Sequence, residues 1–379
     1  MSIPRETRSS TKARPLGDRV ARRLARGLGR LPTVVKRILA GKPMRVDGQT
    51  LDLEAQVAMR LLNLAVSKTF ESLPLEEGRA QIASEAWIFG DALPVAEVRD
   101  IVLPGPGGDL PARLYRPEGL DGPSPALVYF HGGGWVLGDL GAADSVCRFL
   151  AHHASITVIS VDYRLAPENP FPAAVDDALA AFTHVVECAE EYDVDPAAIG
   201  VGGESAGGNL AAVIAQETAR EARETDAPTP AMQLLFMPVT DLSTKHRSYE
   251  LFGEGLFLTE AQMDWYKERY LPEIPSAEDP RVSPLLADDV HDVAPAYVAV
   301  AGFDVLRDEG EAYAHKLAAV GVPVALRRHS GLVHSMVNAT GVGSGARAAL
   351  LEAAGALRMG LGSGIGTSAV DGDAEPHHR

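Results

Sequence analysis

The pentapeptide Gly203-Glu204-Ser205-Ala206-Gly207 decides the fold of this 379-residue chain. The apolar run 199–202 precedes it, and the helix-forming stretch 209–218 follows it. A serine on a sharp turn between a strand and a helix is lifted out of the sheet, and the flanking glycines leave room for the tight backbone. The alternative is a glycine-rich turn without a catalytic role, but the strand before it and the helix after it favour an exposed nucleophile at Ser205.

A glycine loop lies upstream of this serine. The apolar run 126–130 leads into the sequence HGGGW at residues 131–135. Backbone N–H groups of such a loop can turn inward and hydrogen-bond an anionic oxygen, so we expect an oxyanion hole formed by Gly133, Gly134 and Ala206. A phosphate-binding loop is the alternative. It is disfavoured because no Lys-Ser or Lys-Thr pair follows and the G-x-G-x-x-G spacing is absent.

A serine hydroxyl is a poor nucleophile near neutral pH, so a base and an orienting acid are needed downstream. In the fold that the pentapeptide indicates, the chain order is Ser, acid, His. The apolar run 296–301 predicts a buried strand, and Asp304 follows its carboxyl end. Asp308 and Glu309 are rival acids, but they fall in the first turn of a predicted helix, where acidic side chains suit the helix dipole without a catalytic role. Asp304 is therefore the predicted acid.

The predicted base is His334. Residues 324–329 predict the last strand, and the loop 330–336 carries this histidine, which can swing over the serine. His329 is the competitor, but it lies within the predicted strand and would need a shorter loop. We interpret His131, at the start of the glycine loop, as a brace of the turn.

Residues 95–358 contain several motifs that form one set. They are HGGGW at 131–135, VDYRLAPE at 161–168, GESAGG at 203–208, DVLRDEG at 304–310 and His334. This set resembles the bacterial hormone-sensitive-lipase-like (family IV) carboxylesterases of the α/β-hydrolase superfamily. The resemblance implies a mostly parallel central sheet flanked by helices, with a helical cap formed by the N-terminal segment and an insertion.

The resemblance also implies roles for individual residues. Ser205 would be the nucleophile, His334 the base and Asp304 its orienting acid, and the oxyanion hole is the one given above. Two positions depart from the usual family sequence: Glu204 replaces an aspartate, and Met336 replaces a phenylalanine. We expect both changes to affect substrate preference, because Met336 gives a flexible wall in place of a flat, stiff one.

The implied reaction is hydrolysis of a short- to medium-chain ester of a small molecule through an acyl-enzyme, without a metal or cofactor. An amidase, a lactonase or a deacetylase could use the same triad, and a lipase could use it at a lipid surface. A ligand-binding protein on a retired hydrolase fold is disfavoured, since such proteins typically lose the histidine. Relatives of this kind also imply a homodimer through the sheet edge after the last strand.

Composition agrees with a large single core. The chain is 46% hydrophobic and 23% charged, and no apolar stretch approaches the length of a transmembrane helix. The N-terminus lacks the apolar segment of a secretory signal peptide. Cys147 and Cys188 give neither a disulfide framework nor a metal-ligand spacing. We therefore expect a cytoplasmic protein, either free or peripheral at the membrane.

Charge is unevenly distributed. Residues 1–45 carry 13 Lys and Arg against 2 acidic residues, which leaves a net charge of −27 for the rest of the chain. Residues 19–31 predict a basic amphipathic helix with Val20, Leu24, Leu28 and Leu31 at helical spacing. Such a helix can lie weakly on anionic lipid. The alternative that we favour is that its apolar edge docks on the acidic body of the protein. Nucleic-acid binding is excluded, because the acidic remainder would be repelled by phosphate.

The breaks in pattern predict four parts. Residues 1–45 form a basic leader and residues 46–95 a helical cap segment. The catalytic domain spans 96–358, with a cap insertion at about 244–284 that is rich in aromatic residues. Residues 359–379 form a glycine-rich polar tail that we expect to be disordered.

Overall fold

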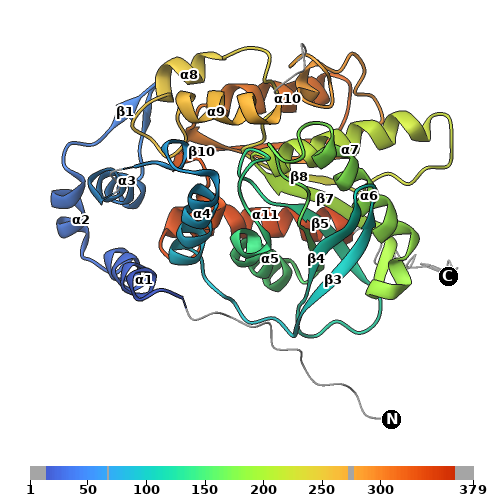
Figure 1. Ribbon diagram of the computed structural model, residues 1–379, viewed down its shortest axis with the longest axis horizontal. Helices are drawn as coiled ribbons and strands as arrows, with labels where there is room; N and C mark the ends of the chain where they lie inside the picture. The colour runs from blue at the N-terminus through green and yellow to red at the C-terminus, as the bar shows by residue number, and fades with distance from the viewer. Residues whose placement is uncertain (1–13, 66–67, 272–276, 363–379) are drawn as a thin grey trace, which may run out of the picture.

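The structure, a computed structural model, describes residues 14–65, 68–271 and 277–362. Its centre is an eight-stranded sheet of order β10-β9-β8-β7-β5-β6-β4-β3, with helices on both faces (Figure 1). The strands are β3 (Glu97–Gly105), β4 (Gly108–Arg116), β5 (Ser124–Phe130), β6 (Thr157–Val161), β7 (Val194–Glu204), β8 (Gln233–Phe236), β9 (Ala296–Phe303) and β10 (Val324–Val333).

The strands from β5 onward pair in parallel, and only β3 and β4 join the sheet antiparallel. Parallel strands that are covered on both faces carry continuous apolar runs, and β6, β8 and β9 are buried along their whole length. The predicted mostly parallel sheet is confirmed. The hairpin between β3 and β4 turns at residues 106 and 107.

Two groups of helices cover the sheet. On one face lie α6 (Ala173–Glu187), α7 (Ala206–Ala222) and α10 (Arg307–Ala319), and on the other lie α5 (Leu140–Ala154) and α11 (Ser344–Gly362). None of the helices in the described ranges is both long and apolar enough to cross a bilayer. The last described turn of α11 falls within the predicted tail 359–379, and residues 363–379 lie outside the described part of the chain.

A cap of helices lies beyond the carboxyl ends of the strands. Its first half contains α1 (Leu16–Gly29), α2 (Thr33–Ala40), α3 (Leu53–Ala65) and α4 (Leu75–Phe89), and its second half, from the insertion, contains α8 (Arg247–Phe252) and α9 (Glu260–Tyr270). The halves contact each other: Phe70 packs edge-on against Trp265 and tilted against Tyr266, with centroid distances of 5.5 and 5.3 Å. These aromatic contacts join two segments that are nearly two hundred residues apart in the chain.

Two expectations for the N-terminal part are corrected. The segment 46–95 is not helical throughout, because β1 (Arg45–Val46) and β2 (Gln49–Thr50) form a short antiparallel hairpin at its start. This hairpin lies against β10, where the N–H of Asp52 donates to the carbonyl oxygen of Gly331 at 2.8 Å. β10 itself continues to Val333, four residues beyond its predicted end.

The predicted docking of the apolar edge of residues 19–31 on the body is wrong for its N-terminal half. Val20 and Leu24 are exposed, whereas Arg22 and Arg26 face the body. The reason is that α4 and the segment after it offer partners for arginine rather than for leucine, as the pairing of Arg26 with Asp91 at 2.8 Å illustrates.

The VDYRLAPE segment is held by an ion pair whose carboxylate is buried. Asp177 of α6 is almost fully buried and accepts hydrogen bonds from the backbone N–H of Arg164 at 2.9 Å and from its Nη2 at 2.7 Å. The guanidinium lies against Gly107 in the β3–β4 turn, where a Cβ would overlap it. One carboxylate thus fixes the segment after β6 to α6 and to the hairpin.

We predict that Asp177→Ala lowers the free energy of unfolding by about 2 kcal/mol, because it removes the buried acceptor of the Arg164 backbone N–H and guanidinium. Urea unfolding followed by circular dichroism measures this. Asp176→Ala, the same change at the exposed neighbouring position, is expected to cost less than about 1 kcal/mol. Equal losses in the two variants would contradict this account of the ion pair.

Candidate active site

Ser205 occupies the single position between β7 and α7. Its φ of 54° and ψ of −119° are strained for a residue other than glycine, and its N–H donates to the carbonyl oxygen of Phe236 at 2.8 Å. The turn is possible because Gly203 and Gly207 have no side chains: a Cβ on Gly207 would overlap the carbonyl oxygen of Phe130. The sequence pattern therefore folds into a strand–turn–helix elbow.

A hydrogen-bonded chain joins the three residues that the sequence singled out. His334 Nε2 lies 3.1 Å from Ser205 Oγ, and His334 Nδ1 lies 2.8 Å from Asp304 Oδ2. Asp304 follows β9, and His334 directly follows β10. Oδ1 of Asp304 accepts the N–H of Leu306 at 3.1 Å, which fixes the carboxylate. All three residues are buried to less than 9% exposure.

The two rival acids are engaged elsewhere. The carboxylate of Asp308 accepts the N–H of Ser248 at 2.9 Å. Glu309 is fully buried and accepts the N–H groups of Thr240 and Asp241 at 2.8 and 3.2 Å, and burial raises its pKa well above the ordinary value. His329 lies within β10, where burial lowers its pKa.

The glycine loop has the conformation that its sequence permits. Gly133 and Gly134 have φ values of 114° and 59°. The carbonyl oxygen of Gly133 accepts the N–H of Leu137 at 2.8 Å, which closes the turn. A Cβ on Gly134 would overlap the ring of Tyr266, so the cap helix α9 lies directly on this loop. In the described part of the chain, the N–H groups of Gly133 and Gly134 donate to no backbone or side-chain acceptor.

His131 braces this loop from beneath. It is fully buried, its Nδ1 lies 2.8 Å from the carbonyl oxygen of Gly132, and its ring stacks on Tyr163 at 4.3 Å. The hydroxyl of Tyr163 in turn donates to the carbonyl oxygen of His131 at 2.8 Å. These contacts are those of a structural residue.

Ser205 and His334 line a cavity of about 1240 Å³ between the sheet and the cap. Its wall is mainly apolar. The larger apolar side chains of the wall include Leu28, Met59, Leu62, Phe70, Ile82, Phe89, Leu258, Tyr266 and Met336. An apolar cavity that ends at a serine hydroxyl has room for an acyl or alkyl group beside that hydroxyl.

Residues 127–338 match the family model of the α/β-hydrolase fold. The chain belongs to this family.

Curated relatives in the α/β-hydrolase family include the carboxylic ester hydrolase LipN of Mycobacterium tuberculosis, 44% identical over 87% of this chain and 89% of its own length. The ethyl acetate hydrolase of Pseudomonas putida is 40% identical over 70% and 84%. Among solved structures, an ester hydrolase from the Lake Arreo metagenome is 39% identical, with a TM-score of 0.78 over 83% of this chain and all of its own. The resemblance to hormone-sensitive-lipase-like carboxylesterases is thereby confirmed.

Glu204, where this α/β-hydrolase departs from the usual aspartate, is a buried carboxylate between two loops. It accepts hydrogen bonds from Asn338 Nδ2 at 2.9 and 3.0 Å and from the N–H of Gly132 at 3.4 Å. Burial raises its pKa. Sequence reasoning missed Asn338, because no motif marks it. Its position four residues after His334 was the only signal.

In the described ranges of this α/β-hydrolase, no three His, Cys, Asp or Glu side chains are grouped as metal ligands would be. The two cysteines are free: Cys147 is buried in α5, and Cys188 ends α6.

We predict that Glu309→Gln leaves kcat/KM for a soluble ester unchanged but alters the pH dependence of stability. Because the pKa of Glu309 is higher in the folded state than the ordinary 4.5, the wild type loses stability as pH rises above 4.5. The glutamine variant lacks this loss. The free energy of unfolding of the wild type should therefore fall, relative to that of the variant, by about 1.4 kcal/mol per pH unit until the folded-state pKa is reached.

Urea unfolding at about pH 5 and about pH 7 tests this prediction. Glu187→Gln, at an exposed glutamate of α6, controls for the loss of one negative charge. A difference between Glu309→Gln and the wild type that stays constant with pH would refute the buried-carboxyl account.

Proposed function

We propose that this chain hydrolyses carboxylic esters of small molecules by acyl transfer through Ser205. The observation that carries the proposal is the buried chain from Ser205 Oγ to His334 Nε2 at 3.1 Å and from His334 Nδ1 to Asp304 Oδ2 at 2.8 Å. Such a chain supplies a nucleophile, a general base and an orienting acid.

In the first step, His334 Nε2 takes the proton of Ser205 as Oγ attacks the ester carbonyl carbon. The carbonyl oxygen becomes an oxyanion, for which the N–H groups of Gly133 and Gly134, together with that of Ala206 at the start of α7, are the proposed donors. The carbon–oxygen bond to the alcohol then breaks. His334 gives its proton to the departing alcohol oxygen, and the acyl group stays on Oγ.

In the second step, water enters and repeats the attack. His334 takes a proton from the water as its oxygen bonds to the acyl carbon, and the same N–H groups hold the second oxyanion. The bond to Oγ breaks, Ser205 regains the proton from His334, and the carboxylic acid leaves. Throughout both steps Asp304 holds the imidazole orientation and stabilises its positive charge.

The proposed substrates are short- to medium-chain acyl esters. The apolar wall of the cavity supports an aliphatic acyl group, and the relative from Pseudomonas putida is an ethyl acetate hydrolase. The triad alone does not separate an ester from an activated amide or a lactone. Ratios of kcat/KM on matched ester and amide substrates make this distinction. A ligand-binding role is disfavoured, because the histidine and its two partners are all in place.

We predict that p-nitrophenyl esters from acetyl to palmitoyl give a maximal rate at short or medium chain length. Ser205→Ala should lower kcat by at least about 10⁴-fold, because the nucleophile is lost. Ser330→Ala, the same change at an exposed serine of β10, is the control and should retain the full rate. Equal rates for the wild type and Ser205→Ala on every ester would overturn the proposed function.

Two proposals concern partners: weak contact of residues 19–31 with a membrane surface, and a homodimer through β10. The second is supported by the position of β10 at the edge of the sheet, where it pairs with β9 alone. Light scattering on the purified chain should give twice the mass of one 40.1 kDa chain. A monomeric mass would refute the dimer.

A further inference from the structure

Exposed apolar side chains gather on one end of the molecule. Of the twelve large apolar residues that are exposed in the described ranges, eight lie between residues 16 and 64. They are Leu16, Val20, Leu24, Val34, Val35, Ile38, Met44 and Leu64. Leu16 and Ile38 are each 74% exposed and Val34 is 66% exposed. A grouped apolar surface of this kind marks an interaction site rather than the scattered exposure of single residues.

The orientation of α1 is fixed by its arginines. Arg22 Nη1 donates to the carbonyl oxygen of Trp87 at 2.8 Å, and its guanidinium lies 4.3 Å from the centre of the Trp87 ring. Arg26 pairs with Asp91 at 2.8 Å. Because these side chains hold the inner face of the helix against α4, the opposite face, with Leu16 and Val20, points to solvent.

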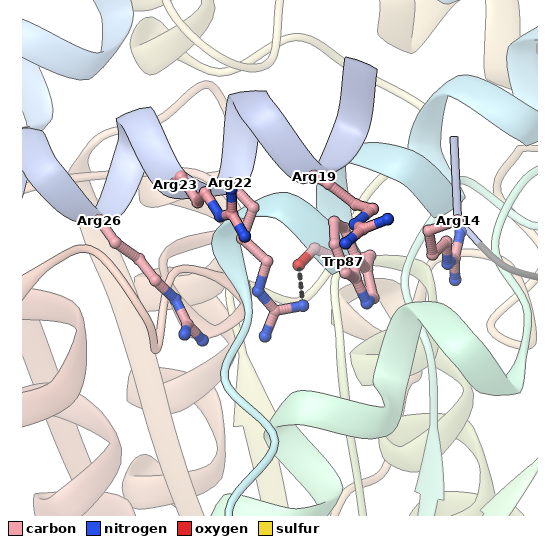
Figure 2. A pocket seen from close by; sticks show the side chains of 6 residues that line it. All are labelled: Arg14, Arg19, Arg22, Arg23, Arg26 and Trp87. Carbon is pink, nitrogen blue, oxygen red and sulfur yellow. Dashed lines mark hydrogen bonds between the residues drawn. The ribbon is translucent and has the colours of Figure 1, made fainter. Parts of the chain in front are cut away.

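Basic side chains of α1 and the segment before it lie on the side of the helix that faces Trp87. Figure 2 shows five arginines of α1 and the segment before it, which together with Trp87 line a hollow of about 440 Å³. The five are Arg14, Arg19, Arg22, Arg23 and Arg26. Of these, only Arg26 has an ion pair with a carboxylate in the described part of the chain. Burial and the neighbouring arginines lower the pKa of Arg22, so an anion would relieve the crowding of positive charge.

The apolar face of α1 continues into the catalytic cavity. Leu24 is 64% exposed and also lines the cavity that reaches Ser205 and His334. Leu28 and Leu31, further along the same edge, line its wall. The cavity therefore reaches the protein surface beside α1, at the border of the exposed apolar patch.

We propose that α1 and α2 form a docking face for an anionic phospholipid surface. Leu16, Val20, Val34 and Ile38 enter the acyl region, and Arg14 and Arg19 bind lipid phosphates. The acidic remainder of the chain, with its net charge of −27 against +11 for residues 1–45, is repelled by the same lipids, so only this end faces them. Docking brings the cavity opening onto the lipid, from which an apolar ester reaches Ser205; this delivery rests on the proposed function, whereas docking does not.

The test uses the full chain and vesicles of phosphatidylcholine with or without phosphatidylglycerol, in a sedimentation assay. The wild type should bind the phosphatidylglycerol vesicles and bind less as salt increases. The triple variant Leu16→Ser/Val20→Ser/Ile38→Ser should lower the partition coefficient by at least about tenfold. Arg19→Glu should weaken binding to the anionic vesicles more than to phosphatidylcholine alone. None of these residues lines the catalytic cavity.

Val102→Ser/Leu351→Ser, at two exposed apolar residues of β3 and α11, is the matched control and should bind as the wild type does. Equal binding by the triple variant and the wild type, or no binding by the wild type, overturns the docking face. So does a dimer in solution that the triple variant abolishes, if vesicle binding is absent.

Hydrolysis assays distinguish docking on the lipid surface from the ester hydrolysis proposed for Ser205. The wild type and all docking variants should cleave soluble p-nitrophenyl butyrate equally, whereas the triple variant should lose activity on 4-methylumbelliferyl palmitate dissolved in the anionic vesicles. A wild type that binds vesicles but cleaves neither ester refutes the proposed function alone. A triple variant that cleaves the vesicle-bound ester as fast as the wild type refutes delivery from lipid.

Discussion

The backbone of Ser205 is the constraint on which the rest of the site depends. A positive φ at a residue other than glycine costs of order 1–3 kcal/mol and persists only where the surroundings hold it. Here the N–H of Ser205 donates to Phe236 at the end of β8, and its carbonyl oxygen accepts the N–H of Val239 at 3.2 Å. On the other side, Gly207 lets α7 touch the end of β5. The strands on both sides of β7 therefore hold the strained serine.

The order of the sheet converts this local turn into a site. Parallel strands bring their carboxyl ends to one edge, where loops can converge. β9 delivers Asp304 and β10 delivers His334 to the edge at which β7 delivers Ser205, although His334 and Ser205 are 129 residues apart. An antiparallel β9 would place Asp304 at the opposite edge. The exclusively parallel pairing from β5 to β10 is thus a condition for the hydrogen-bonded chain as well as for the core.

Sequence reasoning predicted the features that are encoded locally and missed those that depend on distant partners. The elbow, the glycine loop and the residues after β9 and β10 each have their own signature, because a tight turn needs glycine and a buried strand needs apolar side chains. The bond from Asn338 to Glu204 has no such signature, since it joins residues 134 positions apart. The orientation of α1 was mispredicted for the same reason: helical periodicity identifies an apolar edge, but Trp87 and Asp91 decide which edge faces inward.

The N–H groups of the glycine loop have two different uses: one is bonded to Glu204, and the others are the donors proposed for the oxyanion. A buried carboxylate needs hydrogen-bond donors, and Glu204 finds them in Asn338 and in the N–H of Gly132. The first N–H of the glycine loop is thereby engaged, while those of Gly133 and Gly134 have no protein acceptor in the described part of the chain. An aspartate at this position is one methylene shorter and would not reach both donors without a backbone shift. The longer side chain therefore links the segment after His334 to the glycine loop. This link uses the N–H of Gly132 and leaves the N–H groups of Gly133 and Gly134 available for the proposed oxyanion.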